Sequence, residues 1–212
     1  RMMMQAENPD QDFTELRHIG SGGESVGEGI REWAAETFGV DTVEEAYGQT
    51  EANLLVSERA PLVEVREGKM GPAAPGHEVA IVDEQTHERL GPGEVGEIAV
   101  RYEDDPVCFT EYWGRPEKTD RKVQNGWLLT EDRGTVDEDG NFEFVGRTDD
   151  VIISSGYKIG PEEVEETLVG HDAVADAGVI GVPHDERGQV PKAFVVTADG
   201  HEPEALRDRL QS

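Results

Sequence analysis

The segment with the clearest chemistry is Glu45-Ala46-Tyr47-Gly48-Gln49-Thr50-Glu51, which follows a predicted strand. A threonine hydroxyl beside a glutamate carboxylate suits a phosphate and its Mg²⁺, because Mg²⁺ takes one or two carboxylates together with phosphate oxygens. Considered alone, the segment is better explained as a turn in which Thr50 caps a following helix. Its chemistry therefore depends on what the other segments of the chain supply.

A second segment, Ser21-Gly22-Gly23-Glu24-Ser25, comes directly before a predicted helix. Glycine lets a ligand approach the backbone, and a helix N-terminus attracts phosphate or other polar groups. A flexible loop with Ser25 as the N-cap explains the same residues equally well. Both interpretations stay open at this point.

A third segment runs from Gly146 to Glu165 and is long and highly patterned. It joins a β-rich region to a small C-terminal unit. Asp149 therefore lies where a hinge is expected, because hinge residues usually end an element and absorb the change in φ and ψ.

The first 70 residues alternate between strand and helix patterns. We expect a strand at 16–19, a helix at about 26–38 whose apolar residues keep helical spacing, and a strand at 40–46. This β-α-β order favours a parallel sheet. Ligands bind at the carboxyl ends of the strands in open sheets of this kind, which is where residues 45–51 follow.

The pattern changes after Gly71. Short strands at 78–83, 95–101, 127–130 and 142–145 are separated by turns rich in Gly, Pro and Asp. Such spacing is typical of a β-barrel or a β-sandwich.

A third pattern begins at Val151. We expect a strand, a turn at Gly156, a helix from Pro161 to about Val169, and strands at 177–182 and 193–197. A further helix pattern opens at Pro203. These elements make a small α+β domain.

The predicted fold class is thus α/β and α+β: the end of a Rossmann-like β-α-β subdomain, a β-rich barrel subdomain and a small mobile α+β C-terminal domain. The predicted domains are 1–148, with an α/β part at 1–70 and a β-rich part at 71–148, and 149–212.

The composition limits the function classes. The chain has 47 acidic against 19 basic residues and a formal net charge of -28, which excludes an ordinary nucleic-acid binder. Only five of the 19 basic residues are lysine, and this acidic, Arg-over-Lys composition indicates a halophile's cytoplasm, with an acidic mesophilic protein as the alternative. A single cysteine, Cys108, excludes an internal disulfide, and no apolar run reaches the roughly 20 residues of a membrane span.

Together with Gly126-Trp127-Leu128-Leu129-Thr130-Glu131-Asp132, the three segments resemble, in order and separation, the acyl-adenylate-forming enzymes. This superfamily comprises acyl-CoA synthetases, nonribosomal adenylation domains and luciferases. The resemblance covers nearly the whole chain. Residues 47–51 and 153–161 are most similar to medium-chain acyl-CoA synthetases. The resemblance implies that the protein uses ATP, Mg²⁺ and CoA. It also implies a carboxylic acid substrate, which is converted to an acyl-adenylate before its acyl group is transferred to CoA.

The resemblance also implies a role for individual residues. Two walls would border the adenine, formed by Gly23, Glu24 and Ser25 on one side and by Glu45, Ala46, Tyr47, Gly48, Gln49 and Thr50 on the other. Thr50 would contact the α-phosphate and Glu51 would hold Mg²⁺. Asp132 and Arg147 would hydrogen-bond the ribose hydroxyls.

Three residues of the small domain receive roles in the same way. Asp149 would be the hinge between the adenylating and thioester-forming poses, and we count it with Thr50 and Glu51 as catalytic. Gly156 would lie against the pantetheine arm of CoA, where a side chain would block the tunnel. Lys158 would reach a phosphate.

The sequence departs from the family pattern at two positions and varies at a third. Lys158 stands where the family often has arginine, so the charge is kept and the bidentate geometry is lost. Glu131 stands where the family normally has glycine. Gly48 stands where acetyl- and propionyl-specific relatives carry a tryptophan that shortens the acyl pocket, so we expect a medium-chain or aromatic acid.

We expect the chain to be an internal fragment. The family's phosphate loop would precede Arg1, and its late catalytic lysine would follow Ser212. Alternatives remain: an acetyl-CoA synthetase-like enzyme, a carrier-protein-loading adenylation domain, a non-catalytic truncated remnant, or an unrelated acidic binding module.

The first prediction concerns the chain by itself. Because it lacks both family segments, the purified 212-residue chain should show no carboxylate-dependent ATP–pyrophosphate exchange above a Glu51→Ala control. Exchange by the parent chain that exceeds this control would show the expectation to be wrong.

Overall fold

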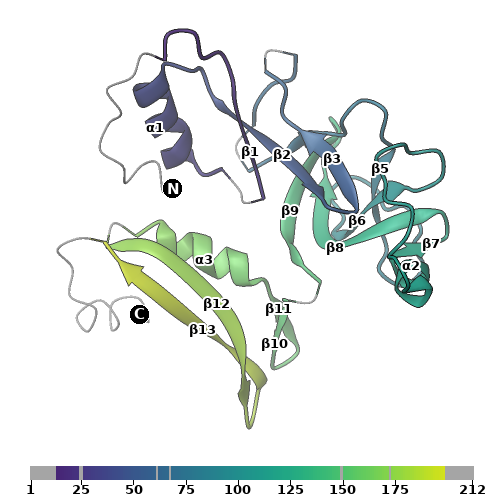
Figure 1. Cartoon of the computed structure of the whole chain (residues 1–212). Helices are drawn as coiled ribbons and strands as arrows, with labels where there is room; N and C mark the ends of the chain where they lie inside the picture. The colour runs from purple at the N-terminus through teal and green to yellow at the C-terminus, as the bar shows by residue number, and fades with distance from the viewer. Residues whose placement is uncertain are drawn as a thin grey trace. The chain divides into compact units, whose positions relative to one another are not determined.

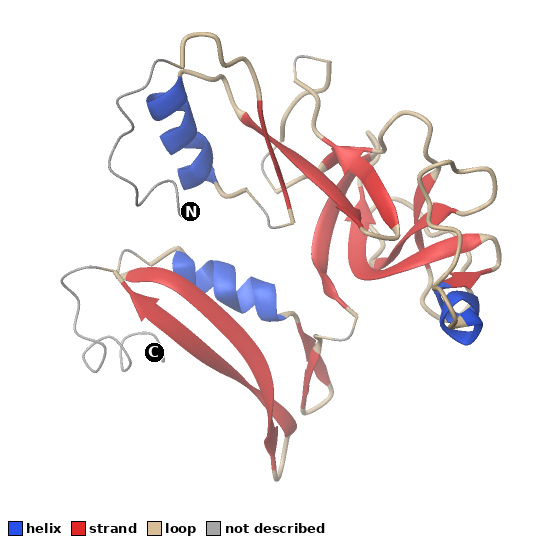
Figure 2. Ribbon diagram, viewed as in Figure 1, coloured by secondary structure: helices blue, strands red, loops and turns tan. Residues whose placement is uncertain are grey.

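The computed structural model describes residues 13–23, 26–60, 62–66, 68–148, 150–171 and 173–198 (Figure 1). Strands make up most of the regular structure (Figure 2). The chain forms two compact units. The first holds the described residues up to Thr130 together with Gly134–Phe144, and the second holds Glu131–Arg133 and the described residues from Val145 onward.

The first unit begins with the expected β-α-β arrangement. Strand β1 (Ile19–Gly22), helix α1 (Glu28–Phe38) and strand β2 (Val43–Gln49) follow one another, and β1 pairs with β2 in parallel. The apolar side of α1 packs in a small core cluster, which includes Ala34, Phe38, Val40 and Val43. Strand β1 lies three residues later than predicted, so the start of the glycine segment belongs to the strand.

A strand that the sequence did not predict completes this sheet. Strand β3 (Ala52–Ser57) pairs antiparallel with β2, which gives the order β1-β2-β3. Thr50 and Glu51 form the turn between β2 and β3, so the interpretation of Thr50 as a helix cap is wrong. The sheet is therefore mixed, and the predicted parallel pair is its first half.

The β-rich part is a curled sheet with the order β4-β9-β8-β6-β5 and with β7 paired to β8. Its strands are β4 (Gly71–Pro72), β5 (Val79–Val82), β6 (Gly96–Arg101), β7 (Val123–Gln124), β8 (Trp127–Val136) and β9 (Asn141–Arg147). A short helix, α2 (Pro116–Lys122), was not predicted. Leu55, Ile81, Ile98 and Leu128 are almost fully buried in the main core, which joins this sheet to β3.

The second unit has the predicted α+β composition. Helix α3 (Pro161–Val169) has the predicted bounds and packs beside β12 (Val174–His184). Strands β10 (Ile152–Ser154) and β11 (Tyr157–Ile159) form a hairpin, and β13 (Gly188–Thr197) completes the order β11-β10-β13-β12. The helix predicted from Pro203 lies outside the described residues. Of the helices described, none has the length and apolarity that crossing a bilayer requires.

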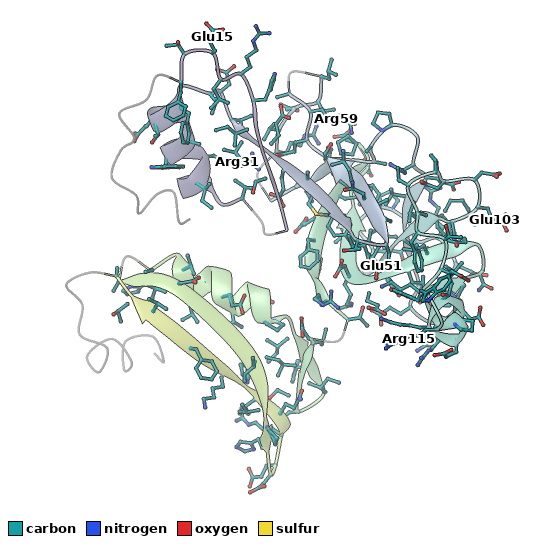
Figure 3. The ribbon with its side chains drawn as sticks, in the orientation of Figure 1. Glu15, Arg31, Glu51, Arg59, Glu103 and Arg115 are labelled. Carbon is teal, nitrogen blue, oxygen red and sulfur yellow. The ribbon has the colours of Figure 1, made fainter. Side chains whose placement is uncertain are left out.

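A partly buried arginine, Arg31, connects helix α1 with the start of β2 and with the residue that follows β3. The guanidinium of Arg31, which is labelled in Figure 3, donates to the Val43 carbonyl. Its Nη2 lies 3.1 Å from Oε2 of Glu58 and 3.7 Å from Oε2 of Glu45. The Glu58 side chain is fully buried, and its Oε1 has no hydrogen-bond partner among the described residues. Because Oε1 is already without a hydrogen bond, the negative charge of the buried Glu58 carboxylate depends on the positive charge of Arg31 for its stabilisation.

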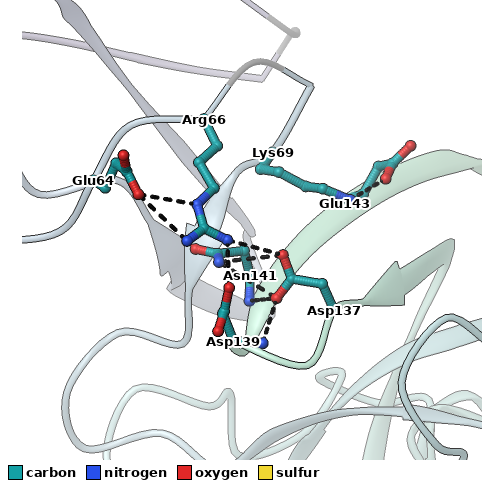
Figure 4. Close-up of polar contacts among 7 residues, drawn as sticks. All are labelled: Glu64, Arg66, Lys69, Asp137, Asp139, Asn141 and Glu143. Carbon is teal, nitrogen blue, oxygen red and sulfur yellow. Dashed lines mark hydrogen bonds and ion pairs between the residues drawn. The ribbon is translucent and has the colours of Figure 1, made fainter.

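An exposed ion network ties the loop after β3 to the turn between β8 and β9 (Figure 4). Arg66 lies 2.8 Å from Asp139 and 3.3 Å from Glu64, and Lys69 pairs with Glu143. Asp137 accepts hydrogen bonds from the backbone of the same turn. Arg66 and its partners are solvent-accessible, so these pairs contribute little to stability and weaken further as salt is added.

Strand β8 contains a strained residue at the point where it passes from the first unit to the second. Glu131 has a φ of 66°, in the left-handed region that favours glycine. Its carbonyl accepts a hydrogen bond of 2.8 Å from the backbone of Thr148, which holds the backbone in place. Glycine adopts this conformation without strain, so the position expected to carry glycine holds a glutamate in a backbone conformation that suits glycine.

Replacing Arg31 with methionine should lower the free energy of unfolding by about 3–5 kcal/mol, because it leaves the buried Glu58 carboxylate uncompensated. Hydrogen exchange of the β2 amides measures the loss locally. A double variant that also carries Glu58→Met should recover much of this stability, since the fully buried carboxylate of Glu58 is then absent. A single variant as stable as the parent would contradict the interpretation.

Replacing Glu131 with glycine should make the protein more stable than Glu131→Ala by about 1 kcal/mol, because alanine keeps the left-handed strain and glycine removes it. Both variants lack the exposed carboxylate, which lies 4.0 Å from Arg147, so the comparison isolates the backbone. Urea denaturation of the two variants measures the difference. Equal stability, or a more stable alanine variant, would show that strain at this position is absent.

Candidate functional site

One hollow of about 530 Å³ lies at the carboxyl ends of β1 and β2. Its lining brings together residues from two of the predicted segments: Gly22, Gly23, Ala46, Tyr47, Gly48, Gln49, Thr50, Asn53 and Leu54. The parallel register explains this, because Gly22 pairs with Ala46. Residues that are separated by more than twenty positions thus become neighbours, as the strand order predicts.

Gly48 is required by the close approach of β2 and β3. A Cβ atom at this position would lie 2.5 Å from the backbone nitrogen of Leu54 and 3.0 Å from the Ala52 carbonyl oxygen. The pairing register shifts here, between Tyr47 and Gln49, and Leu54 takes a φ of 51°. From the sequence, we expect Gly48 to leave space in the acyl pocket. The structure adds that the neighbouring backbone leaves no room for a side chain at this position.

Glu45 fastens the wall of the hollow to helix α1. Its Oε2 accepts a hydrogen bond of 3.1 Å from the backbone of Val26, next to the start of the helix. The backbone of Glu45 exchanges two hydrogen bonds with Glu58, of 2.7 Å to the Glu58 carboxylate and 2.9 Å from the Glu58 amide. The buried Glu45 therefore stabilises the position of β2 beside α1 through these hydrogen bonds.

Glu51 lies at the turn beyond Thr50 and has a phenol hydrogen-bonded to it (Figure 3). The Tyr112 hydroxyl donates to Oε1 of Glu51 at 2.5 Å. Burial would raise the pKa of Glu51, but the Tyr112 hydrogen bond and the positive charges of Lys122 and Lys118 outweigh it, so its pKa lies below the ordinary value. Glu51 is thus a carboxylate at neutral pH. No group of three or more acidic, histidine or cysteine side chains that could hold a metal occurs in the part of the chain that the structure describes.

The end of the hollow is connected to strand β8 through Thr130. Gln49 Nε2 and the buried Lys122 Nζ each donate to the Thr130 carbonyl at 3.3 Å. The Thr130 hydroxyl in turn donates to the Ile98 carbonyl at 2.6 Å. These bonds hold the Gln49 side chain along the edge of the hollow.

Asp132 and Arg147 lie together within the second unit. Arg147 Nη1 donates to Oδ1 of Asp132 at 3.4 Å, from the neighbouring strand β9. Asp132 is buried and Arg147 is half-buried. The structure thus joins two residues that the sequence analysis had assigned to the same ribose.

Gly156 and Lys158 belong to the hairpin of β10 and β11. Gly156 has a φ of 85° and stands beside Ser155, with a φ of 50°, in the two-residue turn between β10 and β11. Lys158 is in β11, and its side chain is not described. Glu24, Ser25 and Asp149 lie outside the described residues. The N-cap of α1 is Gly27, so the interpretation of Ser25 as that cap is wrong.

Four residues near the site were missed by the sequence analysis: Arg31, Glu58, Tyr112 and Lys122. Each acts on a residue far away in the chain, such as Tyr112 on Glu51, 61 positions earlier. Local patterns carry no such signal. For Arg31, the sequence shows only that α1 contains several polar residues. It does not show which of them turns its side chain toward the interior.

Comparisons with known proteins point to one family. The model of the AMP-binding enzyme family matches residues 1–113, and that of the AMP-binding enzyme C-terminal domain matches residues 163–212. The mitochondrial acyl-coenzyme A synthetase ACSM4 of Rattus norvegicus is 44% identical over 202 residues, which are 93% of this chain and 34% of the relative. Human ACSM5 is 41% identical over the whole chain and 37% of its own length. The chain thus spans about a third of the length of these relatives.

Solved structures show the same arrangement. ATP-bound MatB from Rhodopseudomonas palustris superposes with a TM-score of 0.79 at 32% identity, over 87% of this chain and 36% of that one. The anthranilate CoA ligase AuaEII with anthranoyl-AMP gives 0.80 at 32% identity, over 93% and 37%. The predicted fold class is confirmed by these neighbours. On the strength of a family match to more than half of its residues, the chain belongs to the AMP-binding enzymes.

Proposed function

We propose that these residues form part of an acyl-CoA synthetase. Such an enzyme joins a carboxylic acid to the α-phosphate of ATP, with release of pyrophosphate, and then transfers the acyl group to CoA, with release of AMP. The observation that carries the proposal is the hollow in which Gly23 and residues 46–50 meet, with Thr50 and Glu51 following at its edge.

The names of similar proteins support this chemistry. The curated relatives are acyl-coenzyme A synthetases, and the structural neighbours include a protein with bound ATP and ligases with bound acyl-adenylates. These ligands belong to those proteins. Because those proteins share this fold at more than 30% identity, their bound ligands support the proposal that the hollow binds a nucleotide.

In the first step, the chain's task is to hold two anions together. The walls at Gly23 and at residues 45–50 bind the adenine, and the Thr50 hydroxyl donates to the α-phosphate. Positioning of this kind is worth about 7–11 kcal/mol in well-oriented reactions. Asp132 and Arg147 hydrogen-bond the ribose hydroxyls, for which a short acid beside a guanidinium is suited.

Glu51 fits a divalent cation that arrives with ATP. A single carboxylate cannot provide a complete protein site, and Mg²⁺ usually takes one or two carboxylates, with phosphate oxygens and water as its other ligands. The low pKa of Glu51 keeps this carboxylate ionised. When bound, Mg²⁺ would neutralise charge on the phosphates during attack by the substrate carboxylate.

The second step involves the small domain. We assign Asp149 to the hinge, Gly156 to the pantetheine arm of CoA, and Lys158 to a phosphate, as the family resemblance implies. The φ of 85° at Gly156 favours glycine, and none of the described residues crowds the place where its Cβ would be, which leaves room for an approaching ligand.

The acid substrate is of medium chain length or aromatic. Gly48 places no side chain in the hollow, and the partly exposed Leu54 adds an apolar surface beside it. The overall charge of -28 fits a cytoplasm with high salt, where the few cations near the phosphates supply the local attraction.

The gene product that contains these residues should release AMP in a reaction that requires CoA, ATP and an acid. In molar KCl, we expect octanoate or benzoate to give a kcat/KM at least tenfold above that of acetate, because an apolar pocket discriminates by about 10-fold or more for each missing group. A series of acids of increasing length measures this. A preference for acetate, or transfer to a carrier protein in place of CoA, would contradict the proposal.

The role of the site is tested within the same assay. Glu51→Gln should lower kcat/KM by about 10²-fold or more, because it removes the carboxylate proposed to hold the cation that neutralises the phosphates. Glu103→Gln is the matched control, since it removes one exposed carboxylate from the same unit. Equal effects of the two substitutions would show that Glu51 has no special role.

A further inference from the structure

The segment before helix α2 is fastened to the turn that carries Glu51. Cys108 forms a backbone bridge with Ala52, and the Phe109 amide donates to the Glu51 carbonyl at 2.7 Å. The Tyr112 hydroxyl then reaches the Glu51 carboxylate at 2.5 Å. Both the backbone and the side chain of Glu51 are therefore bound by the same short segment.

Tyr112 is itself held from several sides. Its ring meets Phe109 edge-on, with 4.8 Å between the ring centroids, and Lys118 Nζ lies 4.3 Å from the ring centroid. Its amide donates to the Thr119 hydroxyl at 2.9 Å. A phenol fixed in this way does not need to be ordered again when a ligand binds.

The position of the hydroxyl matters because it donates to Oε1 of the Glu51 carboxylate. A hydrogen bond to Oε1 fixes the plane of the carboxylate and thereby the direction of its second oxygen. Groups that orient a metal-binding carboxylate typically change metal affinity 10–100-fold when they are removed. Lys118 and Lys122 add positive charge near Glu51, which attracts phosphate and opposes a free cation.

We propose that Tyr112 is a positioning residue that holds the Glu51 carboxylate ready for a divalent cation carried by ATP. The proposal rests on the proposed function. It assigns to the chain a preference for the metal–nucleotide complex over the free cation, since the surrounding lysines favour the phosphates and the phenol orients the single carboxylate.

Tyr112→Phe tests this with a minimal change, because it removes only the hydroxyl and keeps the ring contacts with Phe109 and Lys118. The control is Tyr102→Phe, which removes a hydroxyl that donates to the Thr110 carbonyl at 2.6 Å in the same region. ATP binding to the gene product is measured calorimetrically, once with Mg²⁺ and once with EDTA.

We expect Tyr112→Phe to weaken ATP binding about tenfold in Mg²⁺ and to leave binding in EDTA unchanged. Tyr102→Phe should change neither. Equal affinity of the parent and Tyr112→Phe in Mg²⁺, an equal loss with and without Mg²⁺, or the same loss in Tyr102→Phe would overturn the proposal.

A double-mutant cycle keeps the test decisive if Tyr112→Phe alters the fold locally. In a Glu51→Gln background, the further change Tyr112→Phe should no longer affect the Mg²⁺ dependence of ATP binding. An undiminished effect in this background would mean that Tyr112 acts through the fold and not through Glu51. A parent that binds no ATP under either condition would overturn the proposed function as well, whereas a Mg²⁺-dependent parent with an unaffected Tyr112→Phe would overturn the positioning role alone.

Discussion

The buried contact between Arg31 and Glu58 is the interaction on which the arrangement of the site depends. It joins the helix after the glycine segment, the beginning of β2 and the residue that follows β3. Glu45, which directly precedes the lining residue Ala46, is hydrogen-bonded to Glu58 through its backbone and to the Val26 amide, just before α1, through its side chain. The same polar cluster therefore holds β2 and the start of α1 together, and its burial makes the ion pair less sensitive to salt than the exposed pairs of Arg66.

Elements with a strong local signal could be predicted from the sequence. Helix α3 begins at Pro161, where proline suits the first helical turn, and its bounds match the expectation. The parallel pairing of β1 with β2 followed from the β-α-β order. Strand β3 was missed because its burial pattern has no period of two: two exposed residues are followed by three buried ones.

The candidate site was predictable to the extent that it is local. Gly23 and residues 46–50 line one hollow because the strand order brings two short segments together. What supports them comes from distant positions, as Tyr112 does for Glu51 and Arg31 does for Glu58. Such pairs are set by tertiary packing, to which propensity and periodicity are blind. Glu131 was predictable only in part. The sequence showed a glutamate where glycine is expected, but only the φ angle shows that the backbone at this position is left-handed.

The close approach of β2 and β3 at Gly48 limits how the hollow can be narrowed by substitution. A side chain at position 48 would collide with the backbone of Leu54, so no single substitution can fill the hollow from this side. The backbone around Leu54 would have to move first, or at the same time. A larger residue at position 48 is therefore coupled to changes that move the β3 backbone, and the hairpin has to change as a unit before the hollow can be narrowed from this position.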